Sequence, residues 1–106
     1  MKDGFIAIFV ACGSGGEAKR IAETLLKKRL IACANITGAV RSRFWWKGKI
    51  DSAREVLLTL KTARANFAKI EKEVKAKHSY DVPEIIAVPI VAGSREYLEW
   101  MNDEIC

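Results

Sequence analysis

The stretch of sequence that decides the fold reads Phe44-Trp45-Trp46-Lys47-Gly48-Lys49-Ile50. Neighbouring side chains on a strand point to opposite faces of a sheet, so a single layer of helices cannot cover both tryptophans. A packed aromatic side chain buries on the order of 150–250 Å², and leaving one in water is unfavourable. Either the strand is sandwiched within the chain or a partner covers its second face. The pattern favours an oligomer with Trp45 and Trp46 at the subunit interface.

Size and composition predict one folded domain over residues 1–106. Half of the 106 residues are hydrophobic, which is sufficient for a core without disulfides or a structural metal. The formal net charge of +5 is spread along the chain, which is typical of a solvated basic face. Three widely spaced cysteines form no disulfide framework, so we expect a reducing, cytoplasmic location.

The apolar run over residues 5–12 has two interpretations. It resembles a short lipoprotein signal that ends at a cysteine, but Asp3 offsets the charge of Lys2 and the run is short for a signal. It also has the apolar character on both faces that is typical of a central strand, which is the interpretation we favour. No stretch approaches the ~20 apolar residues that span a membrane, so we expect no membrane association.

Periodicity and turn residues predict the remaining elements. Ser14 and Glu17 have the spacing of a capping box at the start of a helix. A strand over residues 30–46, a returning strand over 55–61, a helix over 63–77, a strand over 84–91 with Pro89 at an edge or bulge, and a last helix after Ser94 follow. This order predicts an α+β fold, a ferredoxin-like βαββαβ sandwich with an extra C-terminal helix.

The strand over residues 30–46 is too long for its own domain. At ~3.3 Å per residue it would span roughly 55 Å, whereas a compact domain of this size is roughly 33 Å across. The long hairpin that it forms must therefore bend at Gly38 or project beyond the domain. A projecting hairpin offers edges with which another chain can pair, and this predicts a closed homo-oligomer.

Six short segments carry a family resemblance. They are ACANI (32–36), FWWKGKI (44–50), EV (55–56), KT (61–62), HSYDVPEI (78–85) and YLEW (97–100). In order and spacing they resemble the CutA divalent-cation tolerance family over essentially the whole chain. The resemblance implies a homotrimer whose long strands pair between subunits, an architecture close to the PII signalling proteins. It also implies a role in tolerance of copper and other divalent metals without catalytic turnover.

The metal hypothesis rests on Cys12, Cys33 and His78. Thiolate and imidazole are the ligands that Cu(I) or Zn(II) selects, and these positions match metal-binding residues proposed for the family. No cofactor is required, and copper or another divalent metal is the expected ligand. The sequence spacing alone carries little weight, and free cysteines often pack as small hydrophobes, so core packing stays open as an alternative. The family usually has His-Pro-Tyr where this chain has His78-Ser79-Tyr80, so we expect His78 to be less fixed than in relatives.

Three other functions were weighed against metal handling. An acid–base group of His78, Asp81 and Glu84 has no supporting pattern, so we expect no enzyme. The basic and aromatic residues of the hairpin lack the motif of RNA-recognition domains, so we expect no nucleic acid partner. The alternative kept open is a PII-like signalling trimer that senses a small ligand, with Lys61, Tyr80 and Glu84 in the cleft between subunits.

Overall fold

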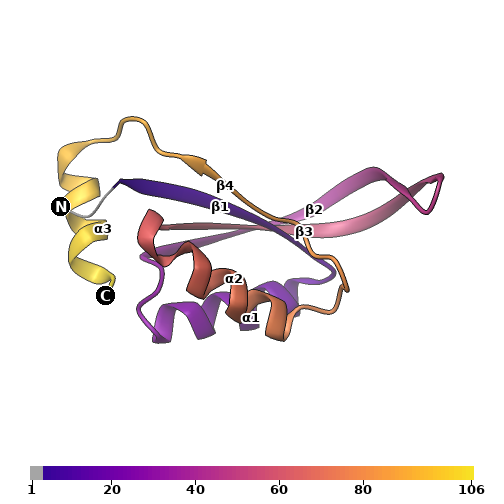
Figure 1. Cartoon of the computed structure of the whole chain (residues 1–106), viewed down its shortest axis with the longest axis horizontal. Coiled ribbons are helices and arrows are strands. Elements are labelled where there is room, and N and C mark those ends of the chain that lie inside the picture. The colour runs from indigo at the N-terminus through magenta and orange to yellow at the C-terminus, as the bar shows by residue number, and fades with distance from the viewer. Residues whose placement is uncertain (1–3) are drawn as a thin grey trace.

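The computed structural model describes residues 4–106 and confirms the predicted order of elements (Figure 1). Lys2 and Asp3, on which the signal interpretation depends, lie outside the described residues. No helix within residues 4–106 is long and apolar enough to cross a membrane. The elements are β1 (Phe5–Cys12), α1 (Gly15–Lys27), β2 (Cys33–Trp46), β3 (Lys49–Ala63), the 3-10 turn η1 (Arg64–Asn66), α2 (Phe67–Lys77), β4 (Ile85–Pro89) and α3 (Arg95–Glu104).

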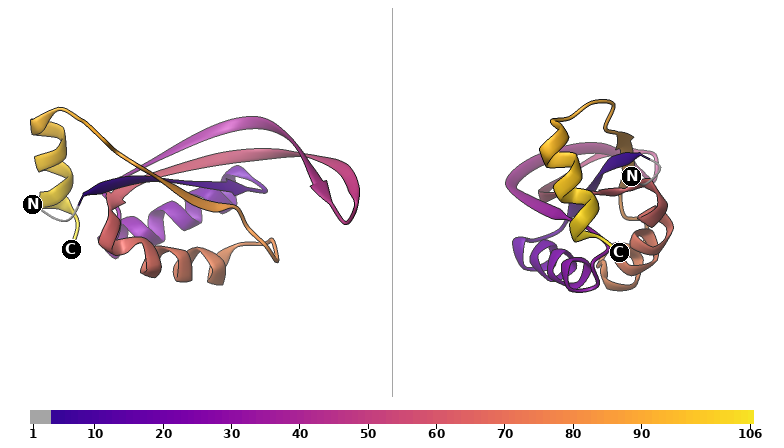
Figure 2. Two further views of the ribbon diagram at one scale, coloured as in Figure 1. Left: turned by 45° about the horizontal axis from the view of Figure 1, so that its top comes forward. Right: turned by 90° about the vertical axis from the view of Figure 1, so that its left-hand side faces the viewer.

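The sheet has the strand order β2-β3-β1-β4 with antiparallel neighbours, which is the ferredoxin-like arrangement. Helices α1 and α2 lie side by side against one face of the sheet, and α3 stands at the end where β1 begins (Figure 2). β1 is the buried inner strand that its apolar run predicts. The core between sheet and helices includes Ile8, Val10, Leu58, Leu60, Ile21, Leu25, Ile70 and Val74.

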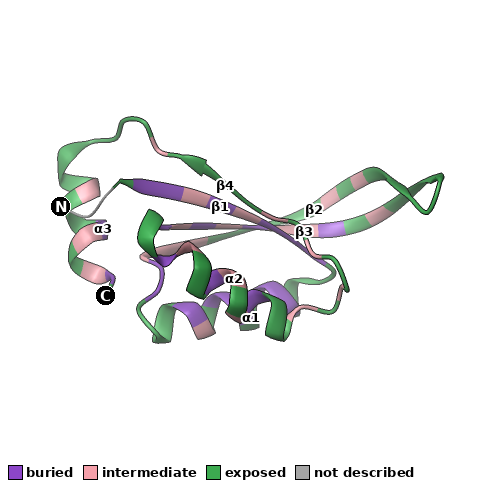
Figure 3. Ribbon diagram, in the orientation of Figure 1, coloured by how far each residue is buried: buried purple, intermediate pink, exposed green. Residues whose placement is uncertain are grey.

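The hairpin both bends and projects. Gly38 and Ala39 together face Val56, because the β2–β3 register shifts between Thr37 and Val40, and this is a β-bulge. Beyond the bulge the hairpin extends past the helices, and the longest dimension of the molecule is 45 Å. Figure 3 shows that the projecting part is largely exposed while the buried residues gather near the helices.

Several element boundaries differ from the predicted ones. β3 begins at Lys49 rather than at residue 55, because it pairs with β2 as far as the turn. β2 begins at Cys33 rather than at residue 30. The chain turns after α1 at Arg29, whose backbone is left-handed (φ 57°), and Leu30 and Ile31 then pack in the core instead of joining the strand. β4 is shorter than predicted and ends at Pro89 on the edge of the sheet, as expected for a residue without an amide hydrogen.

The hairpin turn generates a test of the fold. Lys47 and Gly48 both have positive φ, 51° and 79°, which is the two-residue turn that suits the twist of a hairpin. We expect Gly48→Ala to destabilise the protein by about 1–2 kcal/mol, because an L side chain is unfavourable in this conformation. Gly15→Ala is the control, since a Cβ there meets open space and φ is not positive. Urea unfolding at one fixed protein concentration measures the stability of both variants. Equal stability of the two variants would contradict the positive φ assigned to Gly48 in the turn.

Candidate functional site

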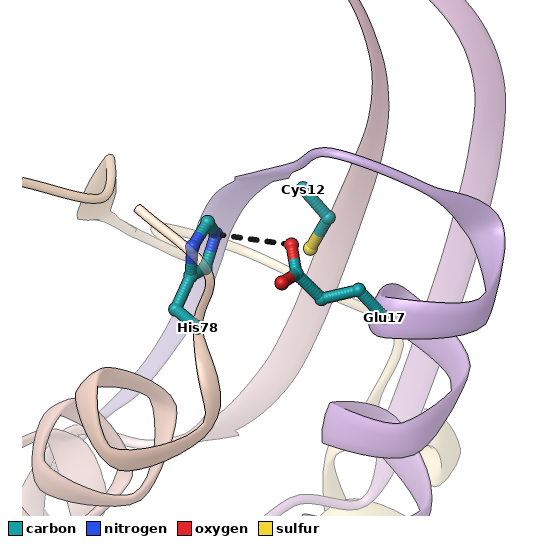
Figure 4. A group of neighbouring side chains, drawn as sticks. All are labelled: Cys12, Glu17 and His78. Atoms are coloured by element: carbon teal, nitrogen blue, oxygen red, sulfur yellow. Dashed lines mark ion pairs between the residues drawn. The ribbon is translucent and has the colours of Figure 1, made fainter. Parts of the chain in front are cut away.

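Three side chains from distant parts of the sequence meet where β1 runs into α1 (Figure 4). Cys12 ends β1, Glu17 lies in the first turn of α1, and His78 follows α2. The Cys12 Sγ, a Glu17 carboxylate oxygen and a His78 ring nitrogen all lie within 4.8 Å of one another. All three side chains are buried. The structure therefore brings together two of the predicted metal ligands and adds Glu17, which the sequence identified only as a capping residue.

The Glu17 carboxylate fastens two backbone segments together. Its Oε1 accepts from the Gly13 amide at 3.0 Å, and its Oε2 accepts from the Ser79 amide at 2.8 Å. The Ser14 hydroxyl accepts from the Glu17 amide at 3.1 Å, so one half of the predicted capping box is confirmed, while the returning bond goes to Gly13. Burial by itself raises the pKa of Glu17, but the hydrogen bonds from Gly13 and Ser79 outweigh it and hold the pKa below its usual value.

Both nitrogens of the His78 ring are already occupied. The Tyr80 amide donates to Nδ1 at 3.1 Å, so Nδ1 carries a lone pair and no hydrogen. Nε2 then carries the hydrogen and donates it to the Ala11 carbonyl at 2.8 Å. Two hydrogen bonds hold the His78 ring in this chain, and the Ser79 amide supplies a hydrogen bond to Glu17 that a proline cannot donate. A metal at either nitrogen must first break one of these bonds.

Cys12 is a protonated thiol. Burial, together with the nearby charges of Glu17 and Glu55, raises its pKa to about 11. Because the thiolate is both the metal ligand and the nucleophile, the resting thiol suits neither role at neutral pH. Cys12 packs in the core beside its strand neighbours. The ring nitrogens of His78 are hydrogen-bonded, and the sulfur of Cys12 is protonated. The Cys12–Glu17–His78 cluster therefore resembles a hydrogen-bonded structural support more than a preformed metal site.

Cys33 and Lys61 lie elsewhere in the chain. Cys33 faces Lys61 on β3, whereas Cys12 faces Val56, five residues away along that strand or roughly 16 Å. The Lys61 ammonium donates to the Asn35 side chain at 3.0 Å, close to the Cys33 thiol. Within one subunit, therefore, Cys33 does not join Cys12 and His78, and Lys61 is separate from the other predicted cleft residues.

Tyr80 and Glu84 line a cavity of about 590 Å³ under the hairpin. Trp46 and Glu55 of the hairpin also line it, and Asp51 and Asp81 bring the number of carboxylates lining it to four, against the single cation of Arg43. The Tyr80 hydroxyl donates to Glu55 Oε2 at 3.0 Å, and burial together with this bond raises the pKa of Tyr80 to about 12. The cavity is thus acidic, partly aromatic and open to ligands, unlike the buried cluster next to it.

The Glu17 carboxylate predicts a pH-dependent stability. A carboxyl whose pKa is lower in the folded state stabilises the fold above its unfolded pKa of about 4.3, and this contribution is lost as the pH falls through the folded value. We expect Glu17→Gln to be less stable by about 1–3 kcal/mol at pH 7, because its amide group faces a backbone donor. Urea unfolding from pH 7 to pH 3 should show the difference from wild type narrowing below about pH 4. Glu23→Gln, an exposed change on the same helix, is the control, and a difference that stays constant with pH would contradict the account.

Comparisons with known proteins agree over almost the whole chain. The sequence profile described as CutA1 divalent ion tolerance protein matches residues 6–104. The divalent-cation tolerance protein CutA of Archaeoglobus fulgidus is 45% identical over 98 residues, which cover 92% of this chain and 95% of that protein. The CutA of Thermus thermophilus is 41% identical over 96 residues, covering 91% and 93%.

Solved structures lead to the same family. The Archaeoglobus fulgidus structure, described as a periplasmic divalent cation tolerance protein, superposes with a TM-score of 0.91 at 44% identity, covering 94% of this chain and 97% of that one. CutA1 from Oryza sativa superposes with a TM-score of 0.94 at 37% identity, covering 97% and 94%. The chain belongs to the CutA1 divalent ion tolerance family.

Proposed function

We propose that this chain acts in divalent-cation tolerance as a homotrimer without catalytic turnover, and that it takes up cations in the acidic cavity beside Tyr80. The family is named for tolerance of divalent ions rather than for a reaction. The observation that carries the proposal is that four carboxylates line one accessible cavity; no three of them, among the described residues, lie close enough together to form a preformed metal site, so the cavity attracts cations through its charge. Carboxylates and water are the ligands that divalent cations such as Mn²⁺ prefer.

The buried cluster has a supporting role in this proposal. Glu17 holds Ser79, and His78 holds the Tyr80 amide, so the two together fix the loop that forms one wall of the cavity. Asp81 and Glu84 on that loop are exposed, and their oxygens are accessible to a cation. Glu55, which also lines the cavity, is buried and already bonded to Tyr80. A cation that competes for Glu55 would release the Tyr80 hydroxyl, which gives the protein a means of response.

Two further parts of the proposal concern the oligomeric assembly and the cellular location of the protein. Trp45 and Trp46 are 72% and 46% exposed in the single subunit, on a hairpin that projects beyond the helices, and a second subunit would cover them. Cys12, Cys33 and Cys106 are free thiols, which supports a reducing, cytoplasmic location.

Small-ligand sensing is the second candidate function for the same cavity. Its volume of about 590 Å³ lies within the range of small-molecule sites, ~300–1,000 Å³. Its lining of Trp46 and Tyr80 with several carboxylates suits an organic cation better than an anion.

A titration with Mn²⁺ tests the cation proposal. We expect the double variant Asp81→Asn, Glu84→Gln to weaken Mn²⁺ binding roughly ten- to a hundredfold, because two charged contacts to the ion are lost. Glu71→Gln is the control, since Glu71 pairs with Lys75 on α2, away from the cavity. Electron paramagnetic resonance of free Mn²⁺ measures the affinity. Equal affinities for wild type and the double variant would exclude the cavity as the cation site and leave small-ligand sensing as the leading function.

A Cu(I) titration tests the Cys12, Cys33 and His78 set, which remains the candidate for copper because two of its members are adjacent. Binding at Cys12 must release the proton of a thiol whose pKa is about 11. We therefore expect weak capture at pH 7, with an apparent affinity that rises about tenfold per pH unit between pH 6 and pH 9. Competition with a chelator, using Cys12→Ser and Cys33→Ser separately, measures this. If Cu(I) bound tightly, with an affinity that changed neither with pH nor in the Cys12→Ser variant, Cys12 would be excluded as a ligand.

Sedimentation of Trp46→Ala tests the assembly. We expect the trimer to dissociate at protein concentrations where the wild type stays intact, because an interface aromatic commonly contributes ~2 kcal/mol or more. Leu26→Ala is the control, since Leu26 is a comparably exposed apolar residue on α1. A variant whose sedimenting mass matches that of the wild type at every concentration would remove Trp46 from the interface.

A further inference from the structure

Two charged side chains of β3 are withdrawn from solvent without an opposite charge in the same subunit. Glu55 is 8% exposed, and Lys61 is the only lysine or arginine within residues 4–106 that is not exposed. Neither residue belongs to an ion pair in the part of the chain that the structure describes. A charge removed from water requires an opposite charge or a full set of hydrogen bonds, so both residues call for a partner.

The hydrogen bonds that these two residues make come from neutral groups. The Glu55 carboxylate accepts from the Tyr80 hydroxyl at 3.0 Å, and the Lys61 ammonium donates to the Asn35 side chain at 3.0 Å. The other buried carboxylate, Glu17, accepts instead from two backbone amides. Glu55 and Lys61 are therefore the charges that a single subunit compensates least.

Both charges lie on the face of the sheet that α1 and α2 do not cover. Leu58 and Leu60 of β3 pack in the core with these helices, which lie together on one side of the sheet (Figure 2). Because side chains alternate along a strand, Glu55, Leu57 and Lys61 project from the opposite side. That side thus has an acidic end, a middle that includes apolar Leu57, and a basic end.

The acidic and basic ends cannot meet within one subunit. Glu55 and Lys61 are six residues apart on the same strand, which is roughly 20 Å at ~3.3 Å per residue. In a closed trimer each subunit contacts the next one through two different surfaces, so one end of this face can meet the other end of its neighbour's face. Opposite charges at the two ends are complementary in such a contact. A second copy of this chain therefore suits both residues.

We propose that Lys61 of the partner subunit completes the acidic cavity by pairing with Glu55. This inference rests on the homotrimer of the proposed function and deepens its cation site. The partner's Lys61 supplies the counter-charge that Glu55 lacks in a single subunit. A divalent cation that binds Glu55 displaces the ammonium of the partner's Lys61, so occupancy of the cavity changes the contact between subunits.

Hybrid trimers test the pairing. Glu55→Gln keeps an acceptor for the Tyr80 hydroxyl, and Lys61→Met keeps the apolar part of the side chain. In trimers of either variant alone, every interface leaves one charge unpaired, whereas hybrids contain interfaces in which both charges are present. After joint refolding we expect the two homotrimers to fall about three- to tenfold below their binomial share. Native mass spectrometry with one variant labelled with ¹⁵N measures the distribution.

Arg54→Gln mixed with Glu55→Gln is the matched control, since it removes one exposed basic residue from the same strand and should give the binomial distribution. A binomial distribution for the Lys61→Met mixture, or an equal bias in both mixtures, would overturn the pairing and leave the homotrimer in place. A wild type that sediments as a monomer would overturn both.

Cation affinity provides a second readout. Lys61→Met removes the ammonium that competes for Glu55, so we expect it to bind Mn²⁺ about tenfold more tightly than the wild type. Arg54→Gln, which changes the net charge equally, should leave the affinity nearly unchanged. Electron paramagnetic resonance of free Mn²⁺ measures both affinities, and an equal gain in the two variants would contradict displacement of the partner's Lys61.

Discussion

The buried carboxylate of Glu17 is the interaction on which the site depends. It accepts one amide hydrogen from Gly13, at the start of α1, and another from Ser79, which is 62 residues further along the chain than Glu17. A buried charge is tolerated only when its hydrogen-bonding capacity is used, and here two backbone donors use it. The consequence reaches beyond the cluster, because the loop that Glu17 holds carries the residues of the cavity wall. The buried cluster thus supports one side of the open cavity.

The hairpin presents different side chains on its two faces, because side chains alternate along a strand. Trp46 and Glu55 line the cavity, whereas Trp45, the neighbour of Trp46 on β2, does not. The bulge at Gly38 and Ala39 sets this arrangement, since a shift of one residue in register exchanges the faces.

Much of the fold follows from local sequence, and the exceptions have physical causes. The Ser14 cap and the edge position of Pro89 are short-range features, and the structure confirms them. The early start of β3 was missed because residues 49–54 are mostly polar and are held by pairing with β2 rather than by the core. The larger role of Glu17 has no local signal, since its partner Ser79 is distant in sequence. Sequence patterns also could not show that Lys61 lies apart from the cavity residues, because its position depends on the register in which β3 pairs with its neighbours.

The most direct measurement on the central claim concerns the tautomer of His78, which is the single histidine of the chain and therefore gives an unambiguous signal. Long-range ¹H–¹⁵N correlation spectra distinguish a bare ring nitrogen from a protonated one. The account predicts that Nδ1 is bare and Nε2 is protonated at neutral pH, because the Tyr80 amide donates to the first and the Ala11 carbonyl accepts from the second. A hydrogen on Nδ1, or a ring signal that shifts stoichiometrically when Cu(I) is added, would contradict it and restore His78 as a metal ligand.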